Sequence, residues 1–272
     1  MTHKATPPRV PARRVARGVP HQKRLAPPIA SPTPGSLLQQ LKSLGDAAAG
    51  EFAQRFFKTG PGEYGEGDRF LGIRVPVLRS LVNDLARDIR DSGIEVALPL
   101  LKSAWHEARA VALMLLVRAF VRGDEASRGR IYAFYLKHTR FINNWDLVDL
   151  SAPHIVGAWL TDKARERSVL TRLAKSPSLW ERRIAIIATL HFIRRGETRD
   201  ALRIAQLLLK DEEDLIHKAV GWMLREVGKH AGEDVEEEFL RRHYKNMPRT
   251  MLRYAIERFA ETKRQRYLQR RI

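Results

Sequence analysis

Four similar segments decide the fold: ARAVAL (Ala108–Leu113), RRIAII (Arg182–Ile187), HKAVGW (His217–Trp222) and RTMLRY (Arg249–Tyr254). Each segment follows a short polar or proline-containing link and precedes another charged turn. The apolar residues in and around them recur with the helical period, and no stretch alternates with period two for long. From residue 36 onward the sequence therefore predicts helices almost throughout.

The spacing of these segments indicates a repeat architecture. Equivalent positions lie 37, 37, 35 and 32 residues apart, at Arg109, Asp146, Arg183, Lys218 and Thr250. Such a period is typical of helical hairpins and somewhat shorter than the roughly 40–47 residues of HEAT units. Because a single helix pair cannot bury its apolar face, stacking of the pairs creates the core. We predict an all-α, right-handed superhelical solenoid of HEAT-like repeats with a concave basic face.

Composition excludes several classes of protein. The 272 residues carry a formal charge of +18, and 44% are hydrophobic, which is enough for a sizeable core. Without cysteine there are no disulfides, thiolate zinc sites or cysteine nucleophiles. No apolar run approaches the roughly 20 residues of a membrane span, and no secretory signal is present, so we expect a cytoplasmic protein, nucleoid-associated in a bacterium. Nucleic acid is the commonest partner of so basic a chain.

The charge and the prolines divide the chain into two parts. Residues 1–35 contain seven Lys or Arg side chains, eight prolines and no acidic residue. Because such dense prolines disfavour both helix and sheet, we expect a disordered basic arm that can add non-specific phosphate contacts. Residues 36–272 form the predicted repeat domain and keep most of the positive charge.

Two familiar motifs fail on their context. Gly60-x-Gly62-x-x-Gly65 matches the dinucleotide-binding pattern, but it follows a helical segment instead of a strand, and acidic residues come directly after it. His106-Glu107 begins like a zinc-protease helix, but alanine stands where the second histidine should be. We therefore expect no cofactor and no metal site.

One carboxylate is out of place in the helical pattern. Asp149 lies one turn from Trp145 on a largely apolar helix face. A charge there is costly unless it meets a cation or a ligand. Asp146, by contrast, suits the first turn of a helix, and Pro153 ends or kinks that helix. Asp149 is thus either a functional carboxylate or half of a salt bridge to a neighbouring repeat.

The next two repeats supply basic and aromatic candidates. Arg183 falls where a core residue is expected, so it either extends to solvent or reaches a carboxylate or a phosphate. Trp222 lies off the apolar stripe of its helix, with Lys218 and Arg225 as neighbours on the same face. An indole between two cations suits nucleic acid, with the cations on the DNA backbone, but an edge tryptophan covering a packing seam is equally common.

Four motifs occur in the order and at the separations of a known family: Phe70-Leu71-Gly72-Ile73-x-x-Pro76, Trp145-Asp146-x-Val148-Asp149 with Pro153, Trp180-x-x-Arg183 and Ala219-x-Gly221-Trp222-x-Leu224-Arg225-Glu226. As a set, over roughly residues 36–262, they resemble the AlkD-type DNA alkylation repair glycosylases.

That resemblance implies a HEAT-like solenoid that cups duplex DNA and removes cationic N3- or N7-alkylated purines without a cofactor. Asp149 would then be the catalytic carboxylate, and Trp145 and Trp222 would flank the damaged nucleotide. Arg183 would hold the backbone of the lesion strand, and Tyr64 would correspond to a further DNA-contacting tyrosine. We expect the protein to act as a monomer.

Two other classes of function remain open on the sequence. One is a non-catalytic HEAT-like solenoid that binds bent or damaged DNA. The other is a HEAT scaffold for a protein or acidic peptide, which the positive charge of the folded part disfavours. The glycosylase that the resemblance implies would use the chemistry of glycoside cleavage, in which a carboxylate stabilises an oxocarbenium-like sugar.

Overall fold

The computed structural model describes residues 33–88 and 93–272, and within these ranges all regular elements are helical. The first helix begins at Pro34, whose missing N–H costs nothing at that position, and the Thr33 side chain accepts a hydrogen bond from Ser36 N at 3.2 Å. The first described helix thus starts two residues before residue 36, where we expect the repeat domain to begin. Residues 1–32, where we expect a disordered arm, lie outside the described ranges.

The elements follow one another with short connections. In chain order they are α1 (Pro34–Leu44), α2 (Ala47–Phe56), α3 (Val75–Asp88), α4 (Gly93–Leu101), α5 (His106–Arg122), α6 (Glu125–Lys137), η1 (Thr139–Phe141), α7 (Trp145–Ala152), η2 (Pro153–Gly157), α8 (Ala158–Leu160), η3 (Ala164–Arg167), α9 (Ser168–Ala174), α10 (Leu179–Ala188), α11 (Leu190–Ile193), α12 (Arg199–Leu207), α13 (Asp214–Ala231), α14 (Glu233–His243), α15 (Arg249–Ala255), η4 (Ile256–Arg258) and α16 (Glu261–Leu268).

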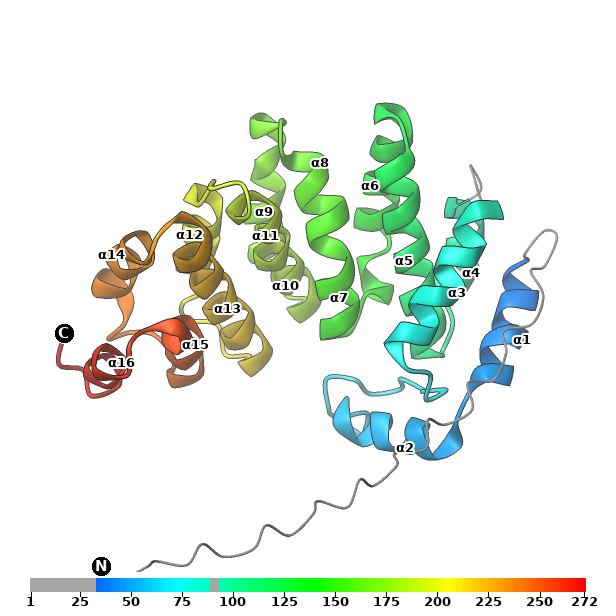
Figure 1. The fold of residues 1–272 in the computed structure, drawn as a ribbon, viewed down its shortest axis with the longest axis horizontal. Helices are drawn as coiled ribbons and strands as arrows, with labels where there is room; N and C mark the ends of the chain where they lie inside the picture. Colours follow the sequence, from blue (N-terminus) through cyan, green and yellow to red (C-terminus); the bar gives the residue numbers. More distant parts are fainter. Residues whose placement is uncertain (1–32, 89–92) are drawn as a thin grey trace, which may run out of the picture.

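The helices succeed one another in chain order along an arc, from α1 at one end to α16 at the other (Figure 1). Helices α5, α10, α13 and α15 contain the four recurring segments, and α7 contains the equivalent Asp146. Helix α5 contacts α7, α7 contacts α10, α10 contacts α13, and α13 contacts α15. The all-helical prediction is therefore confirmed for the described residues, and the helices that carry the recurring segments and Asp146 lie side by side.

Further helices cover this row and complete one core. Helices α4 and α6 pack on α5, α9 packs on α10, and α12 and α14 pack on α13. The buried hydrophobic side chains form a single cluster that runs from Leu37 in α1 to Tyr267 in α16. A shared core of this kind is what repeats need when no single pair can bury its own apolar face.

Pro153 interrupts its helix in a specific way. Helix α7 ends at Ala152, and residues Pro153–Gly157 form a π-helical turn, η2, that leads into α8. Proline lacks the N–H of the α-helical ladder and crowds the carbonyl four residues earlier, and a wider turn relieves both problems. The expected break at Pro153 is therefore present.

Gly221 explains part of the fourth sequence motif. A Cβ atom at this position of α13 would come within 2.4 Å of Met251 O and 2.5 Å of Tyr254 Cβ. Only glycine allows α13 and α15 to approach so closely. The packing of these two helices fixes the C-terminal end of the row.

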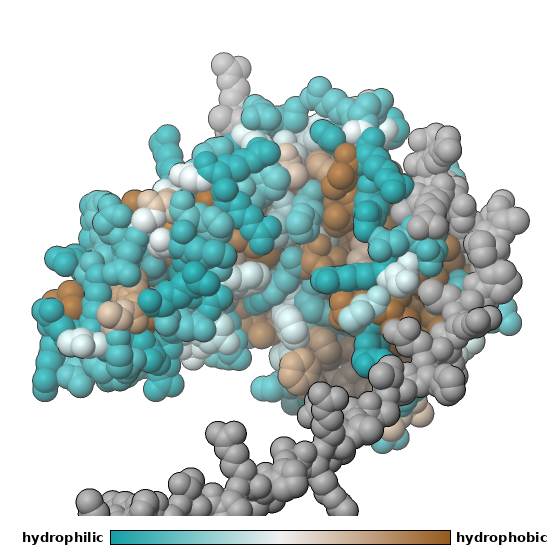
Figure 2. Space-filling model, in the orientation of Figure 1, coloured by the Kyte–Doolittle hydropathy of each residue, from teal (hydrophilic) through white to brown (hydrophobic). Residues whose placement is uncertain are grey.

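The surface differs between the two ends of the arc. Hydrophobic residues gather on the N-terminal part of the visible face, whereas the C-terminal part is mostly hydrophilic (Figure 2). Phe52 and Phe56 of α2 are 65% and 58% exposed. Exposed aromatic residues in one place mark a candidate binding surface. In the described ranges no helix is both long and apolar enough to cross a membrane.

Candidate functional site

Asp149 on α7 is held by Arg183 on α10. Arg183 Nε donates to Asp149 Oδ1 at 3.0 Å, and Nη2 donates to Oδ2 at 2.8 Å. The third nitrogen, Nη1, donates to the carbonyl oxygen of Leu215 at 2.6 Å. The structure therefore contains the salt bridge that the sequence left open, and its hydrogen bonds connect α7, α10 and α13.

The location of Arg183 changes its expected role. The residue is 4% exposed, and all three of its guanidinium nitrogens donate hydrogen bonds inside the protein. Three of its five N–H donors are used in this way, and burial restricts the access of a phosphate to the other two. In this arrangement Arg183 orients Asp149, and its expected contact with the DNA backbone stays a prediction.

The Asp149 side chain is still accessible at 19%, although it is largely buried. Burial raises the pKa of its carboxyl above the ordinary value, the Arg183 guanidinium opposes that rise, and the Asp146 carboxylate adds to it. Two lone-pair positions of a carboxylate remain after a bidentate ion pair, so it can still accept hydrogen bonds from a water molecule.

A second carboxylate, Asp146, lies in the first turn of α7 and is fixed by His106 of α5. His106 Nε2 lies 2.8 Å from Asp146 Oδ2, and Nδ1 lies 3.4 Å from Asp68 Oδ2. Burial would lower the pKa of His106, but the hydrogen bonds to Asp146 and Asp68 outweigh it and raise the pKa to about 9. His106 is therefore an imidazolium at neutral pH and partly neutralises both carboxylates.

Asp68 extends this network to the start of α7. It forms an ion pair with Arg109 at 2.5 Å and accepts a hydrogen bond from Asn144 Nδ2 at 3.1 Å. Asn144 is the N-cap of α7, and its side-chain oxygen accepts from Trp145 N at 2.8 Å. Four members, Asp68, His106, Arg109 and Asn144, are at most 5% exposed, so the network fixes the position of α7 relative to α5.

Aromatic rings surround Trp145 on the side of α2. Trp145 stacks on Phe57 with centroids 5.2 Å apart, and Phe56 meets it edge-on at 6.2 Å. Phe57 in turn stacks on Phe70 at 4.8 Å, and Phe70 stacks on His106 at 4.5 Å. The series joins the exposed helix α2 to the buried His106, and it holds the indole in a fixed orientation.

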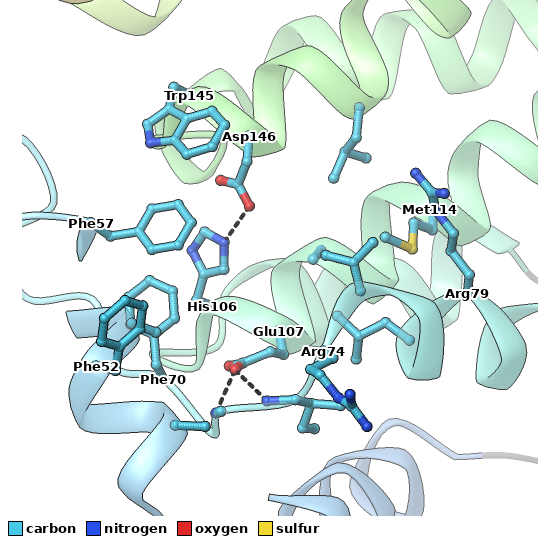
Figure 3. A pocket seen from close by; sticks show the side chains of 18 of the residues that line it. Phe52, Phe57, Phe70, Arg74, Arg79, His106, Glu107, Met114, Trp145 and Asp146 are labelled. Atoms are coloured by element: carbon cyan, nitrogen blue, oxygen red, sulfur yellow. Dashed lines mark hydrogen bonds and ion pairs between the residues drawn. The ribbon is translucent and has the colours of Figure 1, made fainter. Parts of the chain in front are cut away.

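These groups line a pocket of about 590 Å³. Figure 3 shows Trp145, Asp146 and Phe57 along one side and Met114 and Arg79 along the other. The complete lining is Ala49, Phe52, Ala53, Phe57, Phe70, Gly72, Ile73, Arg74, Val75, Leu78, Arg79, His106, Glu107, Ala110, Met114, Trp145, Asp146, Asp149 and Leu150. Size and composition, mostly apolar with a few polar groups, are those of a ligand-binding site.

Glu107 builds the floor of this pocket. Its carboxylate accepts hydrogen bonds from the backbone nitrogens of Leu71, Gly72 and Ile73 at 2.9, 2.8 and 3.2 Å. Gly72 has a φ of +77°, and a Cβ there would meet Asp46 O at 2.2 Å. The first family motif thus supplies a tight turn, and the zinc-protease-like glutamate is structural (Figure 3).

The Gly60-x-Gly62-x-x-Gly65 loop offers no phosphate cradle. Gly60 N donates to Glu63 Oε2 at 2.9 Å, and Gly62 N donates to Glu66 Oε2 at 3.0 Å. Backbone N–H groups that would bind a phosphate are therefore occupied by carboxylates. A dinucleotide does not fit this loop.

Tyr64, from the same loop, lies near Trp145. Its ring meets Trp180 of α10 edge-on at 6.1 Å. Burial raises the pKa of Tyr64, while a hydrogen bond with Trp145 and the charge of Lys218 lower it. Tyr64 therefore lies beside α7 and α10, the helices that carry Asp149 and Arg183. Trp180, which the sequence singled out only as a motif position, contacts Tyr64 and so belongs to the candidate site.

The candidates on α13 are further from the pocket. Trp222 Nε1 donates to Glu226 Oε1 at 3.2 Å, and Lys218 pairs with Asp214 at 2.7 Å. Arg225 pairs with Glu257. Within the described residues, the pocket lining includes neither Trp222 nor its two cationic neighbours. The structure thus joins Trp145, Asp149 and Arg183 closely, and the α13 group lies outside the pocket lining, with Lys218 near enough to Tyr64 to lower its pKa.

Sequence reasoning missed the roles of His106 and Asp146 and the aromatic series on α2. His106 and Asp146 are 40 positions apart, and Asp149 and Arg183 are 34 apart. Both separations are close to one repeat period. A search for opposite charges one period apart could have found these pairs, because equivalent helices of adjacent repeats lie side by side.

Comparison with known proteins bears on the family and the fold of this chain. The sequence model of a family described as DNA alkylation repair enzyme matches residues 37–259. A solved structure, described as a predicted DNA alkylation repair enzyme from Enterococcus faecalis, superposes with a TM-score of 0.64. It is 18% identical, and the match covers 80% of this chain and 97% of that chain, so it shows a shared fold. A search of curated proteins finds no match.

Proposed function

The chain belongs to the DNA alkylation repair enzyme family, and we propose that it is a DNA glycosylase for cationic N3- or N7-alkylated purines in duplex DNA. The observation that carries this proposal is the place of Asp149. Its carboxylate lies at the edge of an aromatic-lined pocket, one turn from Trp145, and Arg183 fixes both of its oxygens.

The reaction needs few groups. An alkylated purine already carries a positive charge, so the C1′–N bond breaks with its electron pair moving to the base, which leaves neutral. The sugar then becomes oxocarbenium-like, and water adds to C1′ while its proton passes to Asp149 or to solvent. A fixed negative charge beside C1′ stabilises this state without a general acid.

Neighbouring residues set up this carboxylate. Arg183 orients Asp149 and opposes the rise of its pKa, which favours the charged form. The Trp145 indole can face a cationic base or sugar, an interaction of about 0.5–2 kcal/mol. His106 holds Asp146 beside the same pocket. Lesions whose glycosidic bond is not already labile should be poor substrates.

The remaining candidates are assigned to DNA binding. We propose that the row of helices is a HEAT-like solenoid that cups duplex DNA. Tyr64, Lys218 and Arg225 would contact the DNA backbone, and Trp222 would lie against the damaged nucleotide together with Trp145. The ion pairs of Lys218 and Arg225 are partly exposed and weak in water, so phosphates can compete for both cations.

The decisive experiment is base release by Asp149→Asn. The variant keeps shape and hydrogen-bonding capacity but loses the charge, so we expect folding and DNA binding to persist and release of 7-methylguanine from methylated duplex DNA to fall at least roughly 100-fold. High-performance chromatography of the free base gives the rate. Release at the wild-type rate would remove Asp149 from the mechanism.

One observation favours a second function. Both Asp149 oxygens accept hydrogen bonds from Arg183, as they would in a purely structural ion pair. A non-catalytic solenoid that binds damaged DNA would have this arrangement too. In that case the wild-type protein binds methylated duplex but releases no free base in the same assay.

A further inference from the structure

The C-terminal end of the arc is strongly basic. Residues 249–272, which contain α15, η4 and α16, carry eight arginine or lysine side chains and two glutamates. Both glutamates already have partners, since Glu257 pairs with Arg225 of α13 and Glu261 pairs with Arg264. Most of the positive charge in this segment is therefore left without a carboxylate from the same segment.

Five exposed arginines carry this charge. Among the residues that the structure describes, none of the five has an ion pair or a side-chain hydrogen bond. Arg241 and Arg242 on the neighbouring α14, by contrast, pair with Glu237 and Glu238. Like charges gathered without counter-ions favour a polyanionic partner. We call the five the C-terminal arginine group: Arg253, Arg258, Arg266, Arg270 and Arg271.

Packing fixes α16, on which this group ends. The fully buried Tyr267 ring lies 5.7 Å from the Phe259 ring and meets the Tyr244 ring edge-on at 5.3 Å. Arg249 Nη1 donates to the carbonyl oxygen of Leu268, in the last turn of α16, at 2.6 Å. Because the helix is held in place, binding of a partner orders little more than the arginine side chains. The family match ends at residue 259, so α16 lies beyond it.

The C-terminal arginine group continues from a part of α13 that we assign to DNA. The hydrogen bond to Asp214 raises the pKa of Lys218, and the nearby Tyr254 and Tyr64 phenols add to this rise. Tyr254 of α15 is 37% exposed and follows Arg253 in the chain. Helices α13 and α15 pack closely, and α15 and α16 follow α13 at the end of the arc (Figure 1). A duplex that contacts Lys218 therefore has the arginines of α15 close by.

We propose that the C-terminal arginine group binds phosphates of duplex DNA to one side of the lesion and so lengthens the stretch of duplex that the protein contacts. The proposal rests on the DNA-binding part of the proposed function and extends it beyond Lys218 and Arg225. A guanidinium matches a phosphate with two parallel hydrogen bonds and is weakly hydrated. Arginines without an ion pair can bind phosphate with no loss of an existing contact.

The salt dependence of binding tests the proposal. Arg266→Gln/Arg270→Gln removes two exposed cations from the full-length protein, and fluorescence anisotropy gives the affinity for a long undamaged duplex at several salt concentrations. Each phosphate contact adds about 0.9 to the slope of log K against log salt, so we expect the magnitude of the slope to fall by about 1.8. A slope equal to that of the wild type would overturn the proposal.

Arg241→Gln/Arg242→Gln is the matched control. It removes the same charge from α14, one of the helices that cover the row, where both guanidinium groups already have carboxylate partners. We expect this variant to keep the wild-type slope. An equal loss of slope in both double variants would show that total charge alone decides binding, and it would reject the C-terminal arginine group as a DNA contact.

Local cleavage of DNA tests the position of the contact directly. Because the chain has no cysteine, an iron chelate can be attached to a single introduced thiol. Gln269→Cys places it at the exposed turn after α16, and Ala126→Cys places it on the exposed surface of α6. Radicals from the chelate cut only nearby DNA, so we expect cleavage of the duplex from position 269 and none from position 126. Any other pattern would overturn the proposal.

Base release by the wild-type protein separates this proposal from the proposed function. Release of 7-methylguanine together with an unchanged slope in Arg266→Gln/Arg270→Gln keeps the glycosylase and rejects the contact. Absence of release, with a smaller slope in that variant and cleavage from position 269, rejects the glycosylase and keeps the contact with DNA.

Discussion

Arg183 orients Asp149 and opposes the rise of its pKa. Arg183 binds both carboxylate oxygens and is itself anchored to the backbone of α13. A guanidinium can do this because its donors form a planar fork that matches a carboxylate. A change in this one side chain should therefore disturb the reaction centre without touching DNA.

Substitution of Arg183 tests this positioning role. We expect Arg183→Gln to slow base release by about 100-fold because the carboxylate loses its fixed geometry. Arg183→Lys should not restore the rate, since an ammonium group cannot bind both oxygens in the same way. The acid limb of the pH profile should move to higher pH in Arg183→Gln, because the charge that opposes the rise in the Asp149 pKa is gone.

DNA binding provides the contrasting measurement for these variants. Because Arg183 donates only to groups inside the protein, the slope of log K against log salt should stay at the wild-type value for Arg183→Gln. A slope whose magnitude is smaller by about one would show that Arg183 contacts a DNA phosphate. Circular dichroism and thermal unfolding would show whether the variant still folds when the largely buried Asp149 lacks its cationic partner.

The wild-type pH profile follows from the environment of Asp149. Burial raises the pKa of this carboxyl above its ordinary 3.8, and the mechanism uses the ionised form. Activity is thus present above the raised pKa and falls as the pH drops through it. We expect the acid limb of kcat, corrected for spontaneous depurination, to have its midpoint above 3.8. A midpoint at or below that value would contradict the assigned carboxylate.

At the scale of elements, α13 and α14 enclose an acidic group that plays no part in the proposed reaction. Glu236 is 2% exposed, and its Oε1 has no hydrogen-bond partner among the described residues. Burial and the nearby Glu233 raise the pKa of Glu236 to about 8. Its Oε2 lies so close to Gly228 that a Cβ there would overlap it. Packing, not pairing, holds this side chain.

Stability should therefore decline as the pH rises from about 4.5 to about 8. The folded pKa of about 8 lies above the ordinary 4.5, so the stabilisation that this difference provides is complete below about pH 4.5 and is lost as the pH rises through 8. The full effect is roughly 3–5 kcal/mol. We expect Glu236→Gln to show a smaller fall in Tm between about pH 6 and pH 9 than the wild type does.

Glu238 on the same helix is the matched control. Its side chain is 66% exposed and pairs with Arg242. Glu238→Gln should reproduce the wild-type dependence of Tm on pH. Equal declines in the Glu236→Gln and wild-type proteins would show that the buried carboxyl does not titrate in this range.

At the scale of the whole molecule, charge is distributed between the helical arc and residues 1–32. All seven cationic side chains of the expected arm lie within residues 1–32. Each phosphate that a cation neutralises adds about 0.9 to the salt slope of DNA binding. We expect the long-range attraction to DNA and the local chemistry at Asp149 to be carried by different parts of the chain.

Removal of residues 1–32 should separate these two contributions. We expect weaker binding to undamaged duplex and a salt slope smaller by up to about 6, with an unchanged rate of base release at saturating DNA. A full-length variant with the seven cations replaced by glutamine should behave the same way. An unchanged slope in both variants would show that these residues do not contact phosphate.

The sequence by itself determined that the described residues are helical, and it named the candidate groups of the site. Helical periodicity and a repeat of 32–37 residues are local properties, so they predicted the all-helical fold and the break at Pro153 without tertiary information. The conflict between Asp149 and its apolar helix face was likewise visible, because one helix turn is enough to reveal it.

Only the tertiary structure decided how these groups pair. Whether Arg183 meets a carboxylate or a phosphate depends on the distance between α7 and α10, and the period alone does not give that distance. The link from His106 to Asp146 and the pocket between α2, α3, α5 and α7 arise from segments far apart in the chain. Side chains of stacked repeats meet across helix interfaces, and packing sets those interfaces.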